Sequence, residues 1–154
     1  MEIQGLKDFL AKPQEGLLFF DEDLLWRFHL AVSSHPFVLL AGLPGSGKTA
    51  LALGYARYLT ADYDSKGYCT LHIRPEWNNS RALMGSYDSH RQEYLSTSFL
   101  DMVLRALRNP EKKYFVILDG IDLARPEYFL SDYLNAMGSE QSVRLHPIER
   151  CIPK

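Results

Sequence analysis

A glycine-rich turn between an apolar run and a helix-forming segment constrains the fold of this chain more than any other feature. Residues 42–49 read GLPGSGKT and match the spacing G-x-x-x-x-G-K-[ST] at all of its fixed positions. Four such positions coincide by chance in about one chain in 200 of this length. The preceding residues, Phe37–Ala41, have the length and hydrophobicity of a strand buried on both faces, and Lys48–Leu59 carry apolar side chains at helical spacing. The sequence therefore predicts a strand–turn–helix unit.

The residue types in this turn predict a binding site for phosphate groups. Glycines let successive backbone N–H groups converge and admit a phosphate closely, and the following helix directs its positive end to the same place. Lys48 adds a cation for the β- and γ-phosphates, and the Thr49 hydroxyl adds a ligand for Mg²⁺. The expected cofactors are ATP or GTP with Mg²⁺. The predicted nucleotide-binding residues are Gly42, Pro44, Gly45, Ser46, Gly47, Lys48, Thr49 and Ala50.

A second apolar run ends in a carboxylate. Tyr114–Leu118 reads as a buried strand, and Asp119 follows it in the position where a neighbouring strand would hold Mg²⁺ through its waters. The predicted metal ligands are therefore Thr49 and Asp119. Hydrolysis also needs a carboxylate that orients water, usually one residue after the metal-binding aspartate, and that position is Gly120. Asp122 is the one weak catalytic candidate, and we interpret it rather as a helix cap, so the sequence supports binding better than turnover.

Polarity divides the rest of the chain into strands and loops. Cys69–Arg74 alternates weakly and is expected to form a strand that ends at Pro75. Residues 76–95 are polar, and we expect a long loop with a short helix there. The tail, residues 139–154, is expected to hold little regular structure beyond a strand at Val143–Leu145.

Helical spacing of apolar residues recurs in three other segments. Phe19–Ser34 begins with acidic residues, and a helix from Ser98 onward begins with a capping box formed by Ser98 and Asp101. Pro126–Met137 has proline near its first turn and Gly138 just past its end. Helices that alternate with strands predict an α/β fold, with a mostly parallel sheet flanked by helices.

The composition excludes several classes of protein. Of the 154 residues, 46% are hydrophobic and 23% charged, which is typical of a globular domain, and a net charge of −2 excludes a strongly basic chain. The two cysteines, Cys69 and Cys151, give neither a disulfide framework nor zinc spacing. The N-terminus has no signal-peptide pattern, and the longest nearly apolar run, Phe37–Leu43, is too short to span a bilayer. We therefore expect a cytoplasmic protein without a membrane partner.

Five segments carry a resemblance to a known family: DEDLLWRFHLAV, PFVLLAGLPGSGKTALALGYA, IRPEWNNSRALMGSYD, STSFLDMVLRAL and YFVILDGIDLARPEYFLSDYLNAM. Taken together, these segments resemble a AAA+ ATPase domain, and more closely the McrB-related branch, the motors of modified-cytosine restriction systems. The resemblance implies a P-loop NTPase fold with Gly42–Thr49 as Walker A and Asp119 as the Walker B aspartate. It also implies ATP or GTP hydrolysis, a homo-oligomeric ring, and DNA and a nuclease subunit as partners. The family usually has Asp-Glu-Met-Asn where this chain has DGID, so the catalytic glutamate is absent.

The resemblance also sets an expectation for domain organisation. Domains of this family continue with a strand bearing a polar sensor, an arginine finger, a further strand and a helical lid, whereas 17 residues (154 − 137) follow Met137 here. We therefore expect the C-terminal strands and lid to be missing, and we interpret the chain as a fragment or an interrupted gene rather than one whose tail fills the gap. The expected organisation is a helical lead-in at 1–36, a partial AAA+ core at 37–138 and an irregular tail at 139–154.

Several functional alternatives stay open. A regulatory or assembly module would bind the nucleotide without cleaving it, which Gly120 favours. A P-loop kinase would use the same turn, but it needs an acceptor site and an arginine-bearing lid, for which the sequence offers no clear residues. A truncated remnant would fold poorly because its sheet is incomplete.

Aromatic and arginine side chains interleave within the segment from residue 74 to residue 91. This pattern is typical of loops that contact nucleic acid, and it is equally typical of a solvated loop that packs its own aromatic side chains. The residues concerned are Arg74, Trp77, Arg81, Tyr87 and Arg91.

Overall fold

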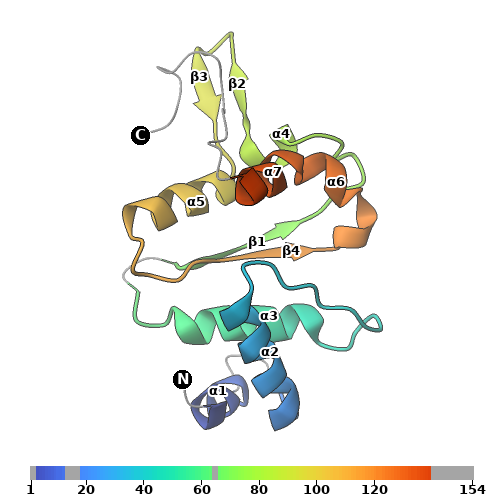
Figure 1. The fold of residues 1–154 in the computed structure, drawn as a ribbon, viewed down its shortest axis with the longest axis vertical. Helices are drawn as coiled ribbons and strands as arrows, with labels where there is room; N and C mark the ends of the chain where they lie inside the picture. The colour runs from blue at the N-terminus through green and yellow to red at the C-terminus, as the bar shows by residue number, and fades with distance from the viewer. Residues whose placement is uncertain (1–2, 13–17, 64–65, 140–154) are drawn as a thin grey trace. The chain divides into compact units, whose positions relative to one another are not determined.

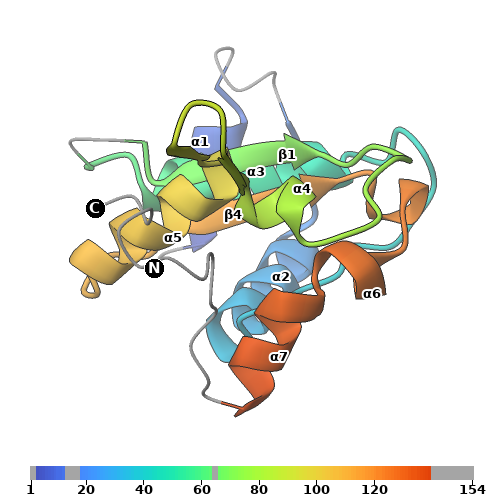
Figure 2. The same ribbon diagram turned by 90° about the horizontal axis from the view of Figure 1, so that it is seen from above.

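The computed structural model describes residues 3–12, 18–63 and 66–139. The chain divides into two compact units, an N-terminal unit that ends at Ser65 and a C-terminal unit that begins at Lys66. Figure 1 and the view from above in Figure 2 show helices in the described part of the N-terminal unit and a mixture of helices and strands in the C-terminal unit. The strand expected at Val143–Leu145 lies outside the described residues, as does the expected tail from residue 140 onward. The domain boundaries expected from the sequence stay a prediction.

The N-terminal unit is built around its first helix. The described helices are α1 (Ile3–Leu10), α2 (Glu22–Ser34) and α3 (Lys48–Leu59), and α1 packs against both of the others. Apolar side chains from all three helices bury one another, which supplies the hydrophobic stabilisation of this unit. The buried apolar residues are Ile3, Leu6, Leu10, Leu25, Phe28, Leu51, Tyr55 and Ala56.

Both ends of α2 follow from local sequence. The side chain of Asp21 accepts a hydrogen bond from the amide of Asp23 at 2.9 Å, and so caps the first turn. His35 is extended (φ −133°, ψ 138°), because a residue that precedes proline avoids the α conformation. The helix predicted for Phe19–Ser34 is therefore confirmed, with a start three residues later.

The prediction of a strand at Phe37–Ala41 is wrong for the described structure. These residues have no regular secondary structure, and Leu39 is 65% exposed. An apolar run becomes a strand only where a neighbouring strand accepts its backbone hydrogen bonds. In the described part of the chain, the ladders pair β1 with β4 and β2 with β3, and neither contains this segment.

A pair of parallel strands forms the centre of the C-terminal unit. β1 (Tyr68–His72) pairs with β4 (Phe115–Asp119) in a register that runs from Tyr68 opposite Phe115 to His72 opposite Asp119. Helix α5 (Ser98–Arg108) connects the two sides of this crossover and packs on β1. The strands expected at these positions and the parallel pairing are confirmed, and a larger P-loop sheet stays a prediction.

The first residues of α5 differ from the expected capping box. The hydroxyl of Thr97 accepts a hydrogen bond from the amide of Leu100 at 3.2 Å, and the same hydroxyl donates to the carbonyl of Leu83. Thr97 is therefore the cap, one residue before the predicted Ser98. Asp101 instead accepts a hydrogen bond at 2.7 Å from the hydroxyl of Ser96.

Residues 76–95 contain more regular structure than the sequence predicts. The expected short helix is α4 (Arg81–Met84), and a hairpin of β2 (Ser86–Asp88) and β3 (Glu93–Leu95) follows it. Figure 1 shows this hairpin projecting from the C-terminal unit, away from β1 and β4. Its turn is held by Asp88, whose carboxylate accepts hydrogen bonds from the amides of His90 and Arg91 at 2.9 and 3.2 Å.

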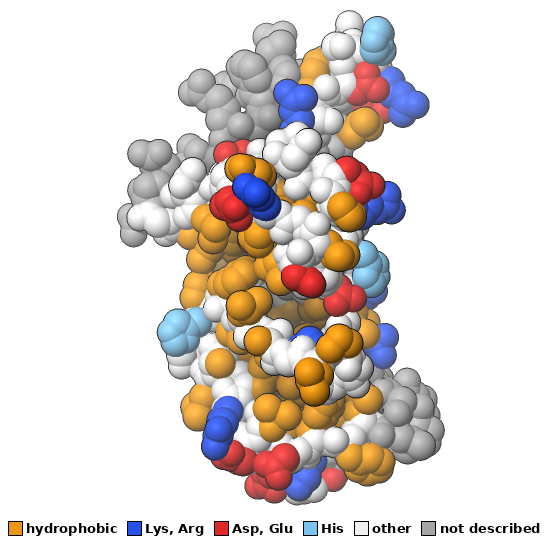
Figure 3. Space-filling view, turned by 90° about the vertical axis from the view of Figure 1, so that its right-hand side faces the viewer, with side chains coloured by type: hydrophobic (Ala, Val, Ile, Leu, Met, Phe, Trp, Pro, Cys, Tyr) orange, Lys and Arg blue, Asp and Glu red, His pale blue; other side chains and the backbone are white. Residues whose placement is uncertain are grey.

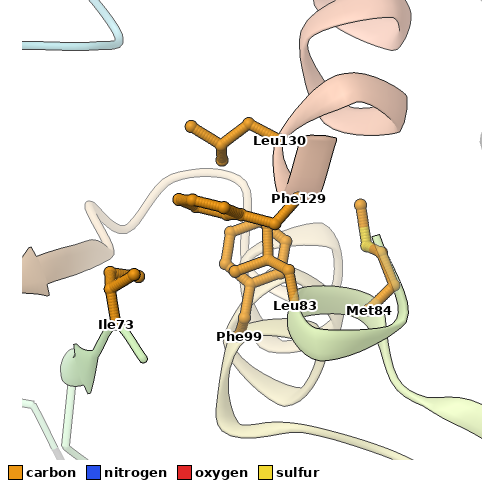
Figure 4. Close-up of a cluster of buried hydrophobic side chains, with 6 residues drawn as sticks. All are labelled: Ile73, Leu83, Met84, Phe99, Phe129 and Leu130. Carbon is orange, nitrogen blue, oxygen red and sulfur yellow. The ribbon is translucent and has the colours of Figure 1, made fainter. Parts of the chain in front are cut away.

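The last helical region is broken in two. α6 (Pro126–Phe129) and α7 (Ser131–Ser139) meet at Leu130, and the 3₁₀ turn η2 (Ile121–Leu123) precedes them. Proline stands at the start of α6 as predicted, whereas Gly138 lies inside α7 rather than past its end. The break lets two consecutive side chains, Phe129 and Leu130, enter the buried cluster drawn in Figure 4. That cluster consists of Ile73, Leu83, Met84, Phe99, Phe129 and Leu130.

Candidate phosphate-binding turn and the end of strand β4

The turn at residues 42–47 joins a segment without regular secondary structure to α3. Gly45 and Gly47 have φ values of +76° and +84°, in the left-handed region that glycine adopts at little cost. The amide of Ser46 donates to the carbonyl of Leu43 at 3.2 Å and closes the turn. α3 begins immediately afterwards, so the predicted turn and helix are confirmed although the predicted strand is not.

The side chain of Lys48 folds back over the turn. Its Nζ donates hydrogen bonds to the carbonyl of Gly42 at 2.9 Å and to the carbonyl of Leu43 at 2.7 Å. These two bonds hold the ammonium group beside the backbone of the turn. An anion that entered the turn would therefore meet a positive charge already in place.

The first turn of α3 presents backbone amides toward the turn. Gly47 is the N-cap and has no side chain to accept a hydrogen bond from those amides. Lys48, Thr49 and Ala50 are partly exposed, and the residues from Gly42 to Ser46 are exposed. Pro44 has no N–H group, so it can fix the shape of the turn but cannot donate a hydrogen bond to a phosphate.

In the C-terminal unit, Asp119 lies at the carboxyl end of β4, as predicted. Its carboxylate Oδ2 is 3.4 Å from Nδ1 of His72, the last residue of β1, and its carbonyl accepts a hydrogen bond from the amide of Ile73 at 2.9 Å. His72 is opposite Asp119 in the ladder, so the parallel register brings the two side chains together. Sequence reasoning missed His72, because nothing in the strand CTLHI indicates its register against FVILD.

Gly120 and Asp122 follow Asp119 in a tight turn. Gly120 has φ +73°, and a Cβ at this position would lie 3.0 Å from Cδ1 of Leu123. The backbone conformation thus favours glycine at this position, where the chain has no carboxylate. Asp122 lies within η2, and α6 has Arg125 as its N-cap without a side-chain hydrogen bond, so the interpretation of Asp122 as a helix cap is wrong. Its catalytic role stays a prediction.

The predicted metal ligands offer a hydroxyl and a carboxylate, which are the oxygen donors that Mg²⁺ prefers. Thr49 belongs to the N-terminal unit and Asp119 to the C-terminal unit, and their convergence on one ion stays a prediction. Among the residues that the structure describes, His, Cys, Asp and Glu side chains form no group of three or more that could hold a metal ion.

Trp77 and Arg91, two residues of the segment from 74 to 91, make contacts within the protein. The Trp77 ring packs edge-on against Phe129, with ring centroids 5.5 Å apart, which favours the packing interpretation for this residue. Arg91 pairs with Asp88 at 3.7 Å and Glu93 at 3.8 Å within the hairpin. On the face drawn in Figure 3, the Lys and Arg side chains of the described residues are scattered among Asp and Glu. A nucleic-acid contact in this segment stays a prediction.

Comparison of the chain with protein-family models, curated proteins and solved structures gave no match. Within the described ranges, the helices are all too short or too polar to cross a membrane.

Proposed function

We propose that this chain binds a nucleoside triphosphate, ATP or GTP together with Mg²⁺, through residues 42–50. The observation that carries the proposal is the position of Lys48, whose Nζ lies 2.9 and 2.7 Å from two carbonyl oxygens of the turn that precedes its own helix. A lysine held at a glycine turn, directly before a helix start, places an ammonium group and backbone amides around one small volume. That combination matches the negative charge of a phosphate chain.

The groups around such a site would have distinct roles. Backbone amides of the turn and of the first turn of α3 would donate hydrogen bonds to phosphate oxygens. Lys48 would exchange its two carbonyl acceptors for phosphate oxygens, which are charged and therefore stronger acceptors. The Thr49 hydroxyl would coordinate the Mg²⁺, and Asp119 would hold that ion through its waters.

Binding without rapid hydrolysis is the form of this function that the chain supports best. A general base one residue after Asp119 is replaced by Gly120, whose positive φ of +73° suits glycine. A regulatory or assembly module that responds to bound nucleotide fits this arrangement. Membership of the McrB-like AAA+ motor family is part of the proposal. Hydrolysis by such a motor would require a general base at a position other than 120.

The experiment compares nucleotide binding by the full chain with binding by two lysine variants. Calorimetric titration with ATP and with GTP, in the presence of Mg²⁺, should give an affinity that falls at least about tenfold in Lys48→Ala, because hydrogen bonds from a charged donor are lost. Lys12→Ala serves as the matched control, since the Lys12 ammonium contacts the Phe9 ring in the same unit. Equal affinities for wild type and Lys48→Ala would contradict the proposal, and phosphate release by wild type should not exceed that of Lys48→Ala.

A further inference from the structure

The parallel ladder places two metal-binding side-chain types at the same sheet end. His72 is the last residue of β1 and Asp119 the last residue of β4, and the two are directly opposite in register. Ligands of parallel sheets bind beyond the carboxyl ends of the strands, where loops leave the sheet and side chains face outward. The pair therefore stands where a bound ion or substrate is expected in this class of sheet.

The separation of the two side chains distinguishes them from a tight ion pair. Nδ1 of His72 and Oδ2 of Asp119 are 3.4 Å apart. A charge-assisted N–H···O hydrogen bond is shorter, about 2.7–2.9 Å. Two ligands that bind one ion at about 2.1 Å, at a tetrahedral angle, lie about 3.4 Å from each other. The observed spacing therefore matches that of two ligands around a shared cation, while it also falls within the range of a His–Asp ion pair.

Both groups are open to solvent. The side chain of His72 is 76% exposed and that of Asp119 is 37% exposed. A hydrated ion can reach them without opening the buried cluster of this unit, and water can complete its coordination shell. His90, in the hairpin turn of the same unit, is also exposed and offers a control histidine.

We propose that His72 and Asp119 together bind a divalent transition-metal ion of the imidazole-binding class. The imidazole nitrogen supplies a donor that Mg²⁺ uses poorly and that Co²⁺, Ni²⁺ and Zn²⁺ use well. The inference rests on the proposed role of Asp119 as a metal ligand and extends it, because His72 shifts the preference of that site from Mg²⁺ toward these ions. The ion would bind before any nucleotide does.

The test uses Co²⁺ alone as the probe, with the full chain and no nucleotide. Titration followed by the visible absorption of Co²⁺ should show a nitrogen-ligand signature in wild type and in His90→Gln. In His72→Gln the affinity should fall at least about tenfold, the scale of losses seen when groups that support a metal ligand are removed. Asp119→Asn should lose affinity to a similar extent, and Mg²⁺ should bind wild type and His72→Gln equally.

The outcomes separate this inference from the proposed function. Unchanged Co²⁺ affinity in His72→Gln, or an equal loss in His90→Gln, would overturn the metal pair. Nucleotide binding by wild type and Lys48→Ala, measured with Mg²⁺ and without Co²⁺, depends on the turn and not on His72. Loss of the metal result with retained nucleotide binding would therefore overturn only the metal pair, and the reverse result would overturn only the nucleotide site.

Discussion

Two glycines inside helices should respond oppositely to the same substitution. A Cβ at Gly54 in α3 would overlap Cδ2 of Leu10, which is buried, whereas a Cβ at Gly138 in α7 meets no atom within 4 Å. Alanine improves helix propensity by up to about 1 kcal/mol at either site, and overpacking costs about 1–3 kcal/mol at Gly54 alone. Gly54→Ala should therefore lower the free energy of unfolding by about 1 kcal/mol, and Gly138→Ala should raise it slightly. Urea unfolding followed by circular dichroism measures both, and stabilisation by Gly54→Ala would contradict the packing.

Single residues of the candidate site were predictable where a motif fixes their spacing. The spacing GLPGSGKT predicted the turn, the start of α3 and the position of Lys48. It could not predict that Lys48 bonds to the carbonyls of Gly42 and Leu43, because side-chain partners depend on the folded backbone. His72 was missed for a similar reason, since strand register arises from tertiary pairing rather than from the strand's own residues.

At the level of secondary-structure elements, the cap of α5 allows a sharp test. Thr97 accepts a hydrogen bond from the amide of Leu100 and donates one to the carbonyl of Leu83, so it joins α5 to α4. Thr97→Ala should lower the free energy of unfolding by about 1–2 kcal/mol, because the first turn loses its cap and a partly buried carbonyl loses its donor. Ser98→Ala, the residue that the sequence indicated, should change it by less than about 0.5 kcal/mol. Urea unfolding of the two variants measures both losses of unfolding free energy. A loss in Ser98→Ala as large as that in Thr97→Ala would contradict Thr97 as the single cap.

Helices were predictable because their signal is local, and strands were less so. Periodicity placed α2, α3 and α5 within a few residues of their observed bounds. Phe37–Ala41 failed as a strand because its hydrophobicity says nothing of whether a partner strand is present. The hairpin of β2 and β3 was missed because three-residue strands are too short to show alternation, and its Asp88 turn has no Asn-Gly or Asp-Gly signal.

At the scale of the whole molecule, the two motifs that predicted nucleotide chemistry belong to different compact units. The turn at residues 42–49 lies in the N-terminal unit, and Asp119 lies in the C-terminal unit. Sequence reasoning treated both as parts of one sheet, because it took Phe37–Ala41 and Tyr114–Leu118 as strands of the same parallel sheet. The joint role of Thr49 and Asp119 in holding one Mg²⁺ therefore stays a prediction.

Buried ionisable groups in both units also make the free energy of unfolding depend on pH in the alkaline range. Burial raises the pKa of the Tyr55 phenol in the N-terminal unit, partly offset by a hydrogen bond with Ser33, and burial raises the pKa of Tyr94 in the C-terminal unit. Burial likewise raises the pKa of the Cys69 thiol, and the charges of Lys66 and Arg105 offset part of this. In each case the folded state favours the protonated form. The stabilisation is complete below the ordinary pKa values, about 8.5 for cysteine and 10 for tyrosine.

The free energy of unfolding should therefore fall as the pH rises through this range. The unfolded chain releases these protons at lower pH than the folded chain, so it binds fewer protons and the slope with pH is negative. Between about pH 8 and 10 the cysteine dominates, and Cys69→Ala and Cys69→Val should both show a shallower decline than wild type. The two variants differ in side-chain volume, so their stabilities at pH 7 should differ while their slopes agree. Urea unfolding at several pH values gives the slopes, and a decline as steep in both variants as in wild type would exclude Cys69 as its source.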